Sequence, residues 1–456
     1  MLRRTMLKLT ALSLGLLASG VSLAAADLGE TLDRALAAAA PGDRLEVIVS
    51  FRQGGAPTVG QITALRLLGI QQGRWMRALP MAGVMATPGQ IAAIARRSDV
   101  ASIHLNRNLR YYNHDARRLS GVDAVQADPG LGFTGRGVTV MVNDSGIDAT
   151  HADLQYGSHV VQNVQALGNV HALLDFLPVT VLENQFNTDI SSGHGTHCAG
   201  SVGGSGARSD GLHRGVAPGA DIVGYGSGAV ISILDAVGGY DYAIAKQYAF
   251  NSPIRVISNS WGTSGAFDPT DPVNIASHAA YRKGIVSVFA AGNDGPTDNT
   301  HNPYAQAPWV ISVGAGNKDG SLADFSSRGN PGESGSFTMP DGSSWTYVNR
   351  PSVVATGVDI VSTRALTGAL PLLATTQDLA LGERAAFYTH MSGTSMATPH
   401  VAGIVALMFE ARPSLSPMQV KQVLEATANA MPGRQPHEVG SGHVDALEAV
   451  QVARGL

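Results

Sequence analysis

The chain has one cysteine, Cys198, among its 456 residues, so no disulfide bond can form within it. Charged residues are also scarce, at 14%, and the formal net charge is only −4. No basic stripe runs along the sequence, which argues against a nucleic-acid partner. The abundant residues are instead hydrophobic, at 44%, and glycine, at 54 positions. This composition favours a loop-rich α/β protein with a large core and more than one domain.

Residues 1–26 have the composition of an export signal. Three basic residues precede an apolar stretch at 9–23, and small residues at 24–26 suit cleavage before Asp27. A buried or membrane-spanning helix is disfavoured, because the stretch is short of the roughly 20 residues that a span needs. The pair Arg3-Arg4 fits a general secretory (Sec) signal as well as a twin-arginine signal. We therefore expect a secreted or periplasmic protein whose mature form has no membrane span.

Residues 27–113 predict a small α+β domain. Leu45–Phe51 and Val100–Leu105 are apolar and rich in β-branched residues, which predicts two strands. Residues 89–97 have the apolar spacing of a helix. Strands and helices therefore alternate over this part of the chain.

Residues 114–456 predict a larger α/β domain, in which short apolar runs suited to buried parallel strands alternate with helical stretches. The clearest helices lie at 231–248 and 272–282. The apolar runs lie at 138–143, 221–225, 256–260, 285–290 and 310–314. We expect an open, mostly parallel sheet with helices on both faces, and ligands at the carboxyl ends of its strands.

Four short motifs carry the chemistry of the chain. In order, they are Asp144-Ser145-Gly146-Ile147, His194-Gly195-Thr196-His197, Ala291-Gly292-Asn293-Asp294 and Gly393-Thr394-Ser395-Met396-Ala397. An acid, a histidine, an amide donor and a serine are the parts of an acyl-transfer site. Residues 396–411 predict a buried helix with Pro399 in its first turn, so Ser395 lies where the helix dipole favours an oxyanion. The order Asp, His, Ser differs from that of α/β-hydrolases and of chymotrypsin-like enzymes.

The motifs and their order resemble those of the subtilisin-like serine proteases, the subtilases, over about residues 120–456. The resemblance implies a serine endopeptidase that forms an acyl-enzyme intermediate and requires no cofactor for its chemistry. It implies that Ser395 is the nucleophile, that His194 is the general base and that Asp144 orients His194. Asn293 and the backbone N–H of Ser395 would form the oxyanion hole.

The same resemblance implies that protein or peptide substrates bind in extended form between two strands. The residues of these strands and of the adjoining pocket would be Gly226, Ser227, Gly228, Ser260, Trp261, Gly262, Ala290, Ala291 and Gly292. No acidic side chain occurs among them, so no preference for basic substrate residues is expected. The Trp261 side chain either walls the cleft or belongs to the core.

Residues 27–113 resemble the ferredoxin-like propeptide of this family, which assists folding and then inhibits the site until it is cut. Folding assistance suits a large parallel sheet, whose non-local pairing is slow. The cut would fall near 111–114; the alternative is a domain that the mature enzyme retains. We expect a monomeric, autoprocessed zymogen. Three segments, 163–187, 330–350 and 364–390, are longer than in compact family members and either reshape the cleft or decorate the surface.

Several residues near the motifs have competing interpretations. Cys198 is more simply a small buried residue than a second nucleophile. His194 and His197 are spaced like two metal ligands, but no acidic residue lies between them, and the resemblance makes His197 structural. Asp148 and Asp153 follow the first motif and are the alternatives to Asp144.

Calcium is a structural cation in many subtilases, so the resemblance makes a calcium site an open expectation. The candidate carboxylates are Asp153, Asp268 and Asp271. None of the loops has the spacing of an EF-hand. The ligands of a metal therefore stay unassigned.

Three other functions are disfavoured by the same motifs. An esterase would need Gly-x-Ser-x-Gly with a histidine after the serine, whereas His194 precedes Ser395 and the motif ends in alanine. An acid-active carboxyl peptidase would need a glutamate in place of His194. A non-catalytic subtilase used for binding is disfavoured because all four catalytic positions hold competent residues.

Overall fold

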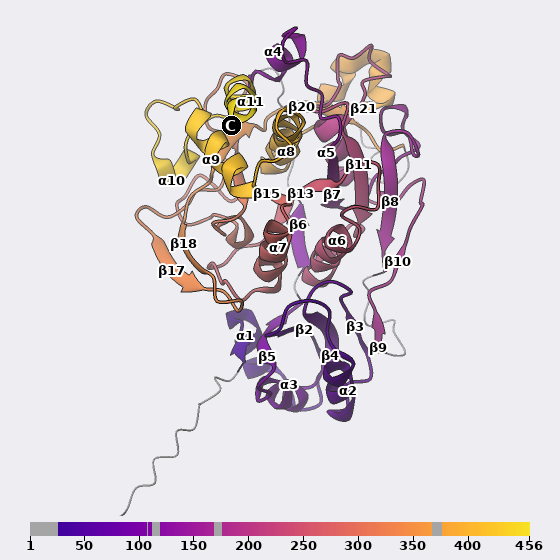
Figure 1. Cartoon of the computed structure of the whole chain (residues 1–456), viewed down its shortest axis with the longest axis vertical. Helices are drawn as coiled ribbons and strands as arrows, with labels where there is room; N and C mark the ends of the chain where they lie inside the picture. Colours follow the sequence, from indigo (N-terminus) through magenta and orange to yellow (C-terminus); the bar gives the residue numbers. More distant parts are fainter. Residues whose placement is uncertain (1–25, 107, 112–118, 168–175, 367–375) are drawn as a thin grey trace, which may run out of the picture.

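The computed structural model describes residues 26–106, 108–111, 119–167, 176–366 and 376–456. Residues 1–25 of the export signal predicted at 1–26, and residues 112–114 of the predicted cleavage region, lie outside these ranges. Figure 1 shows a small N-terminal domain, in indigo, against a larger domain that contains most of the chain. No helix among the described residues is long and apolar enough to cross a membrane.

The N-terminal domain is a sheet backed by three helices. Its elements are β1 (Asp27–Leu28), α1 (Glu30–Ala38), β2 (Leu45–Phe51), α2 (Val59–Leu67), β3 (Gly73–Trp75), β4 (Met81–Ala86), α3 (Pro88–Ala95) and β5 (Val100–Leu105). The strands follow the order β1-β5-β2-β4-β3. A sixth strand, β9 (Phe176–Pro178), comes from the larger domain and pairs in parallel with β3.

Strand β2 shows how this sheet is held on both faces. Val47, Val49 and Phe51 belong to a core that includes residues of α1, α2 and α3. Ile48 belongs instead to a core shared with the larger domain. Because successive side chains of a strand point to opposite faces, one face of the sheet packs on its own helices and the other on the larger domain.

The larger domain is built on an eight-stranded sheet in the order β10-β8-β11-β7-β13-β15-β16-β19. Only β10 pairs antiparallel with its neighbour; the other strands are parallel. The strands are β7 (Thr139–Asp144), β8 (Val160–Ala166), β10 (Val181–Leu182), β11 (Asp221–Gly226), β13 (Ile254–Asn259), β15 (Val286–Ala290), β16 (Ile311–Gly316) and β19 (Val353–Thr356). Each of the five predicted strands forms, with its ends within two residues of the prediction.

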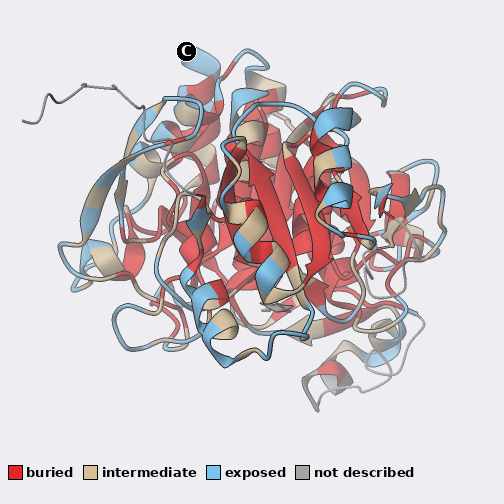
Figure 2. Ribbon diagram, turned by 90° about the horizontal axis from the view of Figure 1, so that it is seen from below, coloured by how far each residue is buried: buried red, intermediate tan, exposed pale blue. Residues whose placement is uncertain are grey.

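Helices cover both faces of this sheet (Figure 1). On one face, Val140 and Val142 of β7 share a core with residues of α5, α8 and α11, whereas Met141 faces α6 and α7. Figure 2 shows the strands buried, with exposed residues on the outer faces of the helices and in loops. The helices are α4 (Val122–Ala127), α5 (His194–Gly203), α6 (Ile233–Ala245), α7 (Pro272–Arg282), α8 (Thr394–Ala411), α9 (Pro417–Thr427), α10 (Pro436–Val439) and α11 (Ala446–Gly455). The predicted α/β architecture is confirmed.

Three predicted helices differ in their bounds. The helix predicted at 89–97 is α3, which begins one residue earlier and ends at Ala95. The helix predicted at 231–248 is α6, which spans only Ile233–Ala245. Residues 231–232 pair with 108–109 as the short strand β12 (Ile231–Ser232), and the Ser232 side chain caps α6 by accepting from the Asp235 N–H. The helix predicted at 396–411 already begins at Thr394. Pro399 therefore lies in the second turn of α8, not in the first.

The three long segments have regular structure of their own. Segment 330–350 contains a hairpin of β17 (Ser334–Thr338) and β18 (Ser344–Val348). Segment 364–390 contains the 3₁₀ stretch η5 (Thr376–Ala386) and reaches β21 (Tyr388–Met391), which pairs with β20 (Ile360–Thr363). Segment 163–187 leaves β8, forms β9 on the N-terminal domain and returns through β10.

The two domains are also joined by polar contacts. The buried Asp241 carboxylate on α6 accepts hydrogen bonds from the backbone N–H groups of Arg77, Ala78 and Leu79, at 2.8, 2.5 and 3.0 Å. The Asn106 side chain accepts a bond from the Leu234 N–H, at the start of α6, at 2.7 Å. The N-terminal domain is therefore specifically docked on α6.

Candidate active site

Asp144 and His194 meet at the carboxyl end of the sheet. Asp144 is the last residue of β7 and His194 is the first of α5. The Nδ1 atom of His194 lies 2.6 Å from Oδ1 of Asp144, and both side chains are buried. Burial disfavours the imidazolium, but the charge and hydrogen bond of Asp144, together with the interaction with Cys198, outweigh burial and raise the pKa of His194 well above its usual value.

A second acidic residue, Asp189, holds the turn that leads into His194. Its buried carboxylate accepts from the backbone N–H of Gly193 at 2.9 Å and from the N–H and hydroxyl of Thr196 at 3.0 and 2.7 Å. It also accepts from the Ser145 hydroxyl, which in turn accepts from the Gly195 N–H at 2.8 Å. Burial raises the pKa of Asp189 against the effect of these bonds.

Sequence analysis missed Asp189, because an acid in a loop rich in serine normally indicates a solvated turn. For Gly195, by contrast, the residue type itself indicates a close approach of two backbone segments. A Cβ at this position would lie 2.2 Å from the carbonyl oxygen of Gly146. Only glycine therefore lets α5 approach the Asp144 turn this closely.

Ser395 lies in the first turn of α8, and its side chain is fully buried. Its hydroxyl donates to the backbone carbonyl of Ser260 at 2.7 Å, and the Ser260 hydroxyl donates to the carbonyl of Ser395 at 2.7 Å. Proline has no N–H group, so Pro399 cannot make the usual i to i−4 helix bond to the Ser395 carbonyl. The Ser260 hydroxyl takes the place of that donor.

Asn293 is held at its carbonyl end. Its Oδ1 accepts from the backbone N–H of Thr394 at 2.9 Å and from the Thr394 hydroxyl at 3.0 Å. The same hydroxyl accepts from the Gly292 N–H at 3.2 Å. Because Oδ1 is engaged by two donors, the amide NH₂ is directed away from Thr394 and is the group of Asn293 able to donate to a ligand.

Two other candidates, Cys198 and His197, lie near the predicted triad of Asp144, His194 and Ser395, and their contacts are structural. Cys198 is buried in α5, with its sulfur 3.7 Å from Nδ1 of His194, and burial raises the pKa of its thiol to about 11. Nε2 of His197 lies 3.2 and 3.1 Å from the carbonyls of Ile360 and Thr389. Burial lowers the pKa of His197 to about 3. Both residues are therefore neutral at physiological pH.

Asp148 and Asp153, the alternatives to Asp144, bind other groups. Asp148 accepts from the Thr150 hydroxyl and from the Leu366 N–H. Asp153 accepts from the Tyr388 hydroxyl and from two backbone N–H groups of the loop at 206–208. Among the described residues, the one group of ligand-type side chains close enough to share a metal is Asp144, His194 and Cys198. Calcium binding stays a prediction.

A segment of the chain lies between two strands beside the triad. Strand β6 (Asn108–Tyr111) pairs antiparallel with β12 on one side and with β14 (Trp261–Gly262) on the other. The predicted strand at 260–262 therefore binds an extended backbone. The Trp261 ring is fully buried and donates from Nε1 to the Asn143 carbonyl at 2.7 Å, so its side chain belongs to the core.

The prediction for the opposite strand, 226–228, needs a correction. Gly226 is the last residue of β11, and the N–H groups of Ser227 and Gly228 donate to the carbonyls of Asp144 and Ser145. These backbone groups are used to hold the Asp144 turn. The strand that pairs with β6 is β12, three residues further along.

Of the predicted pocket residues, Ala290 is the last residue of β15, and Ala291 and Gly292 follow it, next to Asn293. Asp144, Ser260 and Asn293 thus lie at or just beyond the ends of β7, β13 and β15, three adjacent strands. The four motifs are linked in steps: Asp144 bonds to His194, the Cys198 sulfur lies 3.7 Å from Nδ1 of His194 and 3.6 Å from the Ser395 carbonyl oxygen, and Asn293 bonds to Thr394. Their catalytic roles stay predictions.

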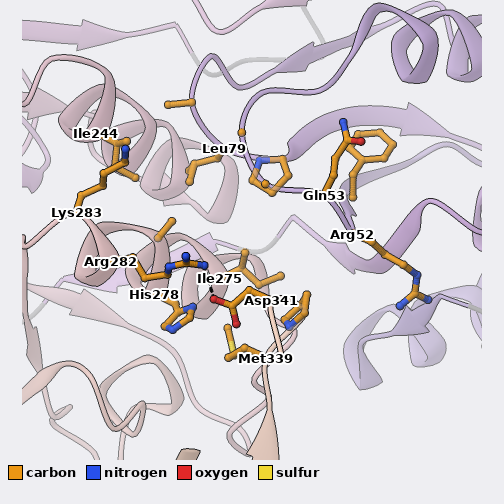
Figure 3. A pocket seen from close by; sticks show the side chains of 17 residues that line it. Arg52, Gln53, Leu79, Ile244, Ile275, His278, Arg282, Lys283, Met339 and Asp341 are labelled. Atoms are coloured by element: carbon orange, nitrogen blue, oxygen red, sulfur yellow. Dashed lines mark hydrogen bonds and ion pairs between the residues drawn. The ribbon is translucent and has the colours of Figure 1, made fainter. Parts of the chain in front are cut away.

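A separate cavity of about 600 Å³ lies away from the four motifs. Figure 3 shows it between Arg52, Gln53 and Leu79 of the N-terminal domain and Ile244, Ile275 and His278 of α6 and α7. Its wall includes an ion pair of Arg282 and Asp341 at 2.5 Å. The cavity therefore belongs to the domain interface.

Comparison with known proteins gives consistent matches. Residues 135–442 match the model of the subtilase family. Serine protease AprX of Bacillus subtilis (strain 168) is 30% identical over 431 residues, which cover 89% of this chain and 88% of that protein. Fervidolysin of Fervidobacterium pennivorans is 31% identical over 361 residues, which cover 76% of this chain but only 46% of fervidolysin.

The crystal structure of fervidolysin, described as a keratinolytic enzyme related to subtilisin, shares the fold. The TM-score is 0.64 at 22% identity, over 94% of this chain and 63% of that one.

Proposed function

Because the chain belongs to the subtilase family and is a serine-type endopeptidase, we propose that it cleaves peptide bonds with Asp144, His194 and Ser395. The observation that carries this proposal is the buried Asp144–His194 pair, which lies at the end of β7 beside the two strands that hold β6. Substrates are proteins or peptides in extended form.

In the proposed reaction, Ser395 attacks the carbonyl carbon of the scissile bond. Its hydroxyl must first leave the Ser260 carbonyl, to which it donates at rest, and pass its proton to His194. Asp144 stabilises the resulting imidazolium and does not take the proton itself. The amide of Asn293 and the Ser395 N–H, at the start of α8, donate to the oxyanion.

His194 then gives its proton to the leaving amine, and an acyl-enzyme forms on Ser395. Water attacks this ester, with His194 again acting as the base. The carbon–oxygen bond of the ester breaks and Ser395 regains its proton.

We also propose that residues 27–113 are a propeptide. The support is the position of β6, whose backbone occupies the place between β12 and β14 where a substrate strand would bind. In this state the site is blocked by the chain's own segment. Export and self-processing follow from the composition of residues 1–26 and from this occupancy. The active form is proposed to be a monomer.

The test compares the exported wild-type protein with Ser395→Ala, by intact mass and N-terminal sequencing. If Ser395 removes the propeptide, the wild type begins near His114 and the variant begins near Asp27. If both proteins begin near His114, another protease makes the cut. If purified, folded Ser395→Ala hydrolyses an unfolded protein at the wild-type rate, Ser395 is not the nucleophile.

A further inference from the structure

The segment that leaves the larger domain after β8 places one of its residues inside the core of the N-terminal domain. Phe176 of β9 is fully buried and belongs to the same core as Val47 and Leu65. Among the described residues, every other member of this core lies between residues 26 and 105. The core of the N-terminal domain is thus completed by a residue from the other domain.

Backbone pairing fixes this residue in place. Gly73, Arg74 and Trp75 of β3 pair in parallel with 176–178, and the Val179 N–H donates to the Trp75 carbonyl at 2.8 Å. In Figure 1, β9 lies beside β3 at the edge of the N-terminal domain. This is strand addition to an open sheet edge, a known mode of recognition between separate chains.

Side chains of the N-terminal domain are arranged around the added strand. The Trp75 ring packs edge to face on Phe176, with 5.1 Å between ring centroids. Arg66 donates to the Phe176 carbonyl at 3.1 Å. At Gly73 a Cβ would lie 3.0 Å from the Phe176 ring and 2.6 Å from the Gly83 carbonyl, so glycine gives the ring its room.

The C-terminal end of this segment is bound to the larger domain. After β9 the chain pairs with β8 through β10, and Glu183 accepts from the Tyr242 hydroxyl on α6 at 2.8 Å. Lys246 forms an ion pair with the same Glu183 at 3.1 Å. Residues 176–182, which we name the docking arm, therefore connect the two domains at a place remote in sequence from the predicted cut.

We propose that the docking arm is a further binding site for the N-terminal domain, separate from the substrate cleft and from the contacts with α6. It holds this domain on the enzyme after the chain is cut near 111–114, and its release sets how long inhibition lasts. The inference rests on the proposed propeptide role of residues 27–113. The free arm would present an unpaired strand and the Phe176 ring, which suit the N-terminal domain of this chain or of a second copy.

The test uses the full chain with Ser395→Ala and a recognition site for an unrelated protease within 112–118. After that protease has cut the chain, the sample is diluted, and size exclusion with mass spectrometry follows release of the N-terminal fragment over time. The chain's own activity is not needed, so failure of the proposed catalysis would not disturb this measurement.

Phe176→Ala is expected to speed release about 30-fold or more, because truncating a fully buried aromatic anchor of an interface costs about 2 kcal/mol or more. Leu177→Ala is the matched control, since Leu177 is the next residue of β9 and is 41% exposed; its release should stay within about threefold of the wild type. Phe176→Leu keeps an apolar side chain and is expected to lie between the two.

Thermal unfolding of the uncut proteins shows whether each variant is folded. If Phe176→Ala does not fold, Phe176→Leu alone decides the question. Release at the wild-type rate in a folded Phe176→Ala or Phe176→Leu protein would overturn the proposal, as would equally fast release in Leu177→Ala. A second measurement follows exchange of the N-terminal fragment between labelled and unlabelled molecules. Faster exchange in Phe176→Ala than in the wild type would support binding of the fragment by the docking arm of its own chain or of a second copy.

Discussion

Replacing Thr394 by valine tests whether the Asn293 amide is oriented by its neighbour. The substitution keeps the shape of the side chain but removes the hydroxyl that donates to Oδ1 of Asn293 at 3.0 Å. The backbone N–H of Thr394 still donates to the same oxygen at 2.9 Å. One of the two restraints on the amide is therefore lost and one remains.

The structure sets the size of the expected effect. A neutral hydrogen bond contributes about 0.5–1.5 kcal/mol net, which corresponds to a loss in kcat of between about 2-fold and 12-fold. Loss of the whole amide donor gives the upper limit, about 10²–10³-fold, a magnitude that comes from a subtilisin and hence from a relative of this protein. KM should change little, because the oxyanion exists only after attack.

The assay measures kcat and KM on a chromogenic peptide for four proteins: wild type, Thr394→Val, Asn293→Ala and the double variant. When Asn293 is already alanine, adding Thr394→Val should lower kcat by less than about twofold, because Thr394 acts on catalysis through the Asn293 amide. Thr394→Ser retains the hydroxyl and is the matched control, and thermal unfolding reports any loss of stability. An equal loss of kcat with and without Asn293 would refute the reasoning.

Two further predictions follow from the buried groups of the site. Activity should rise with pH through the raised pKa of His194, since only the neutral imidazole accepts a proton. Asp144→Asn should lower this pKa, move the pH profile of kcat/KM to lower pH and reduce kcat by about 10⁴-fold. A pH profile that does not move would contradict the role of Asp144. The same shift stabilises the folded protein below the unfolded pKa of about 6.5, and this contribution is lost as pH rises through the folded pKa. Cys198, whose pKa is raised to about 11, should resist alkylation by iodoacetamide at pH 8 until the protein unfolds; rapid labelling of the native protein, followed by mass spectrometry, would show that the thiol is accessible.

The sequence by itself determined the parts of the site that depend on residue type and order. Apolar runs predicted the five central strands, because a strand buried on both faces must be apolar along its length. The motifs and their order, through the resemblance to the subtilases, predicted that Asp144 pairs with His194, and the structure shows this pair; the contact of His194 with the Ser395 hydroxyl stays a prediction. The start of α8 was missed by two residues, because Thr394 and Ser395 are polar and gave no apolar signal.

The tertiary structure decided what depends on contacts between distant segments. The role of Asp189 depends on Ser145, which is 44 residues away and reaches its carboxylate only when α5 lies against the Asp144 turn. Residues 226–228 are rich in glycine like a substrate strand, but their N–H groups are taken by the Asp144 turn, and β12 lies opposite β14 instead. Phe176 lies in segment 163–187, for which the sequence predicts either a reshaped cleft or surface decoration. It completes the N-terminal core because β3 leaves an open edge, and which strand fills an open edge is set by the packing of whole domains, not by local sequence.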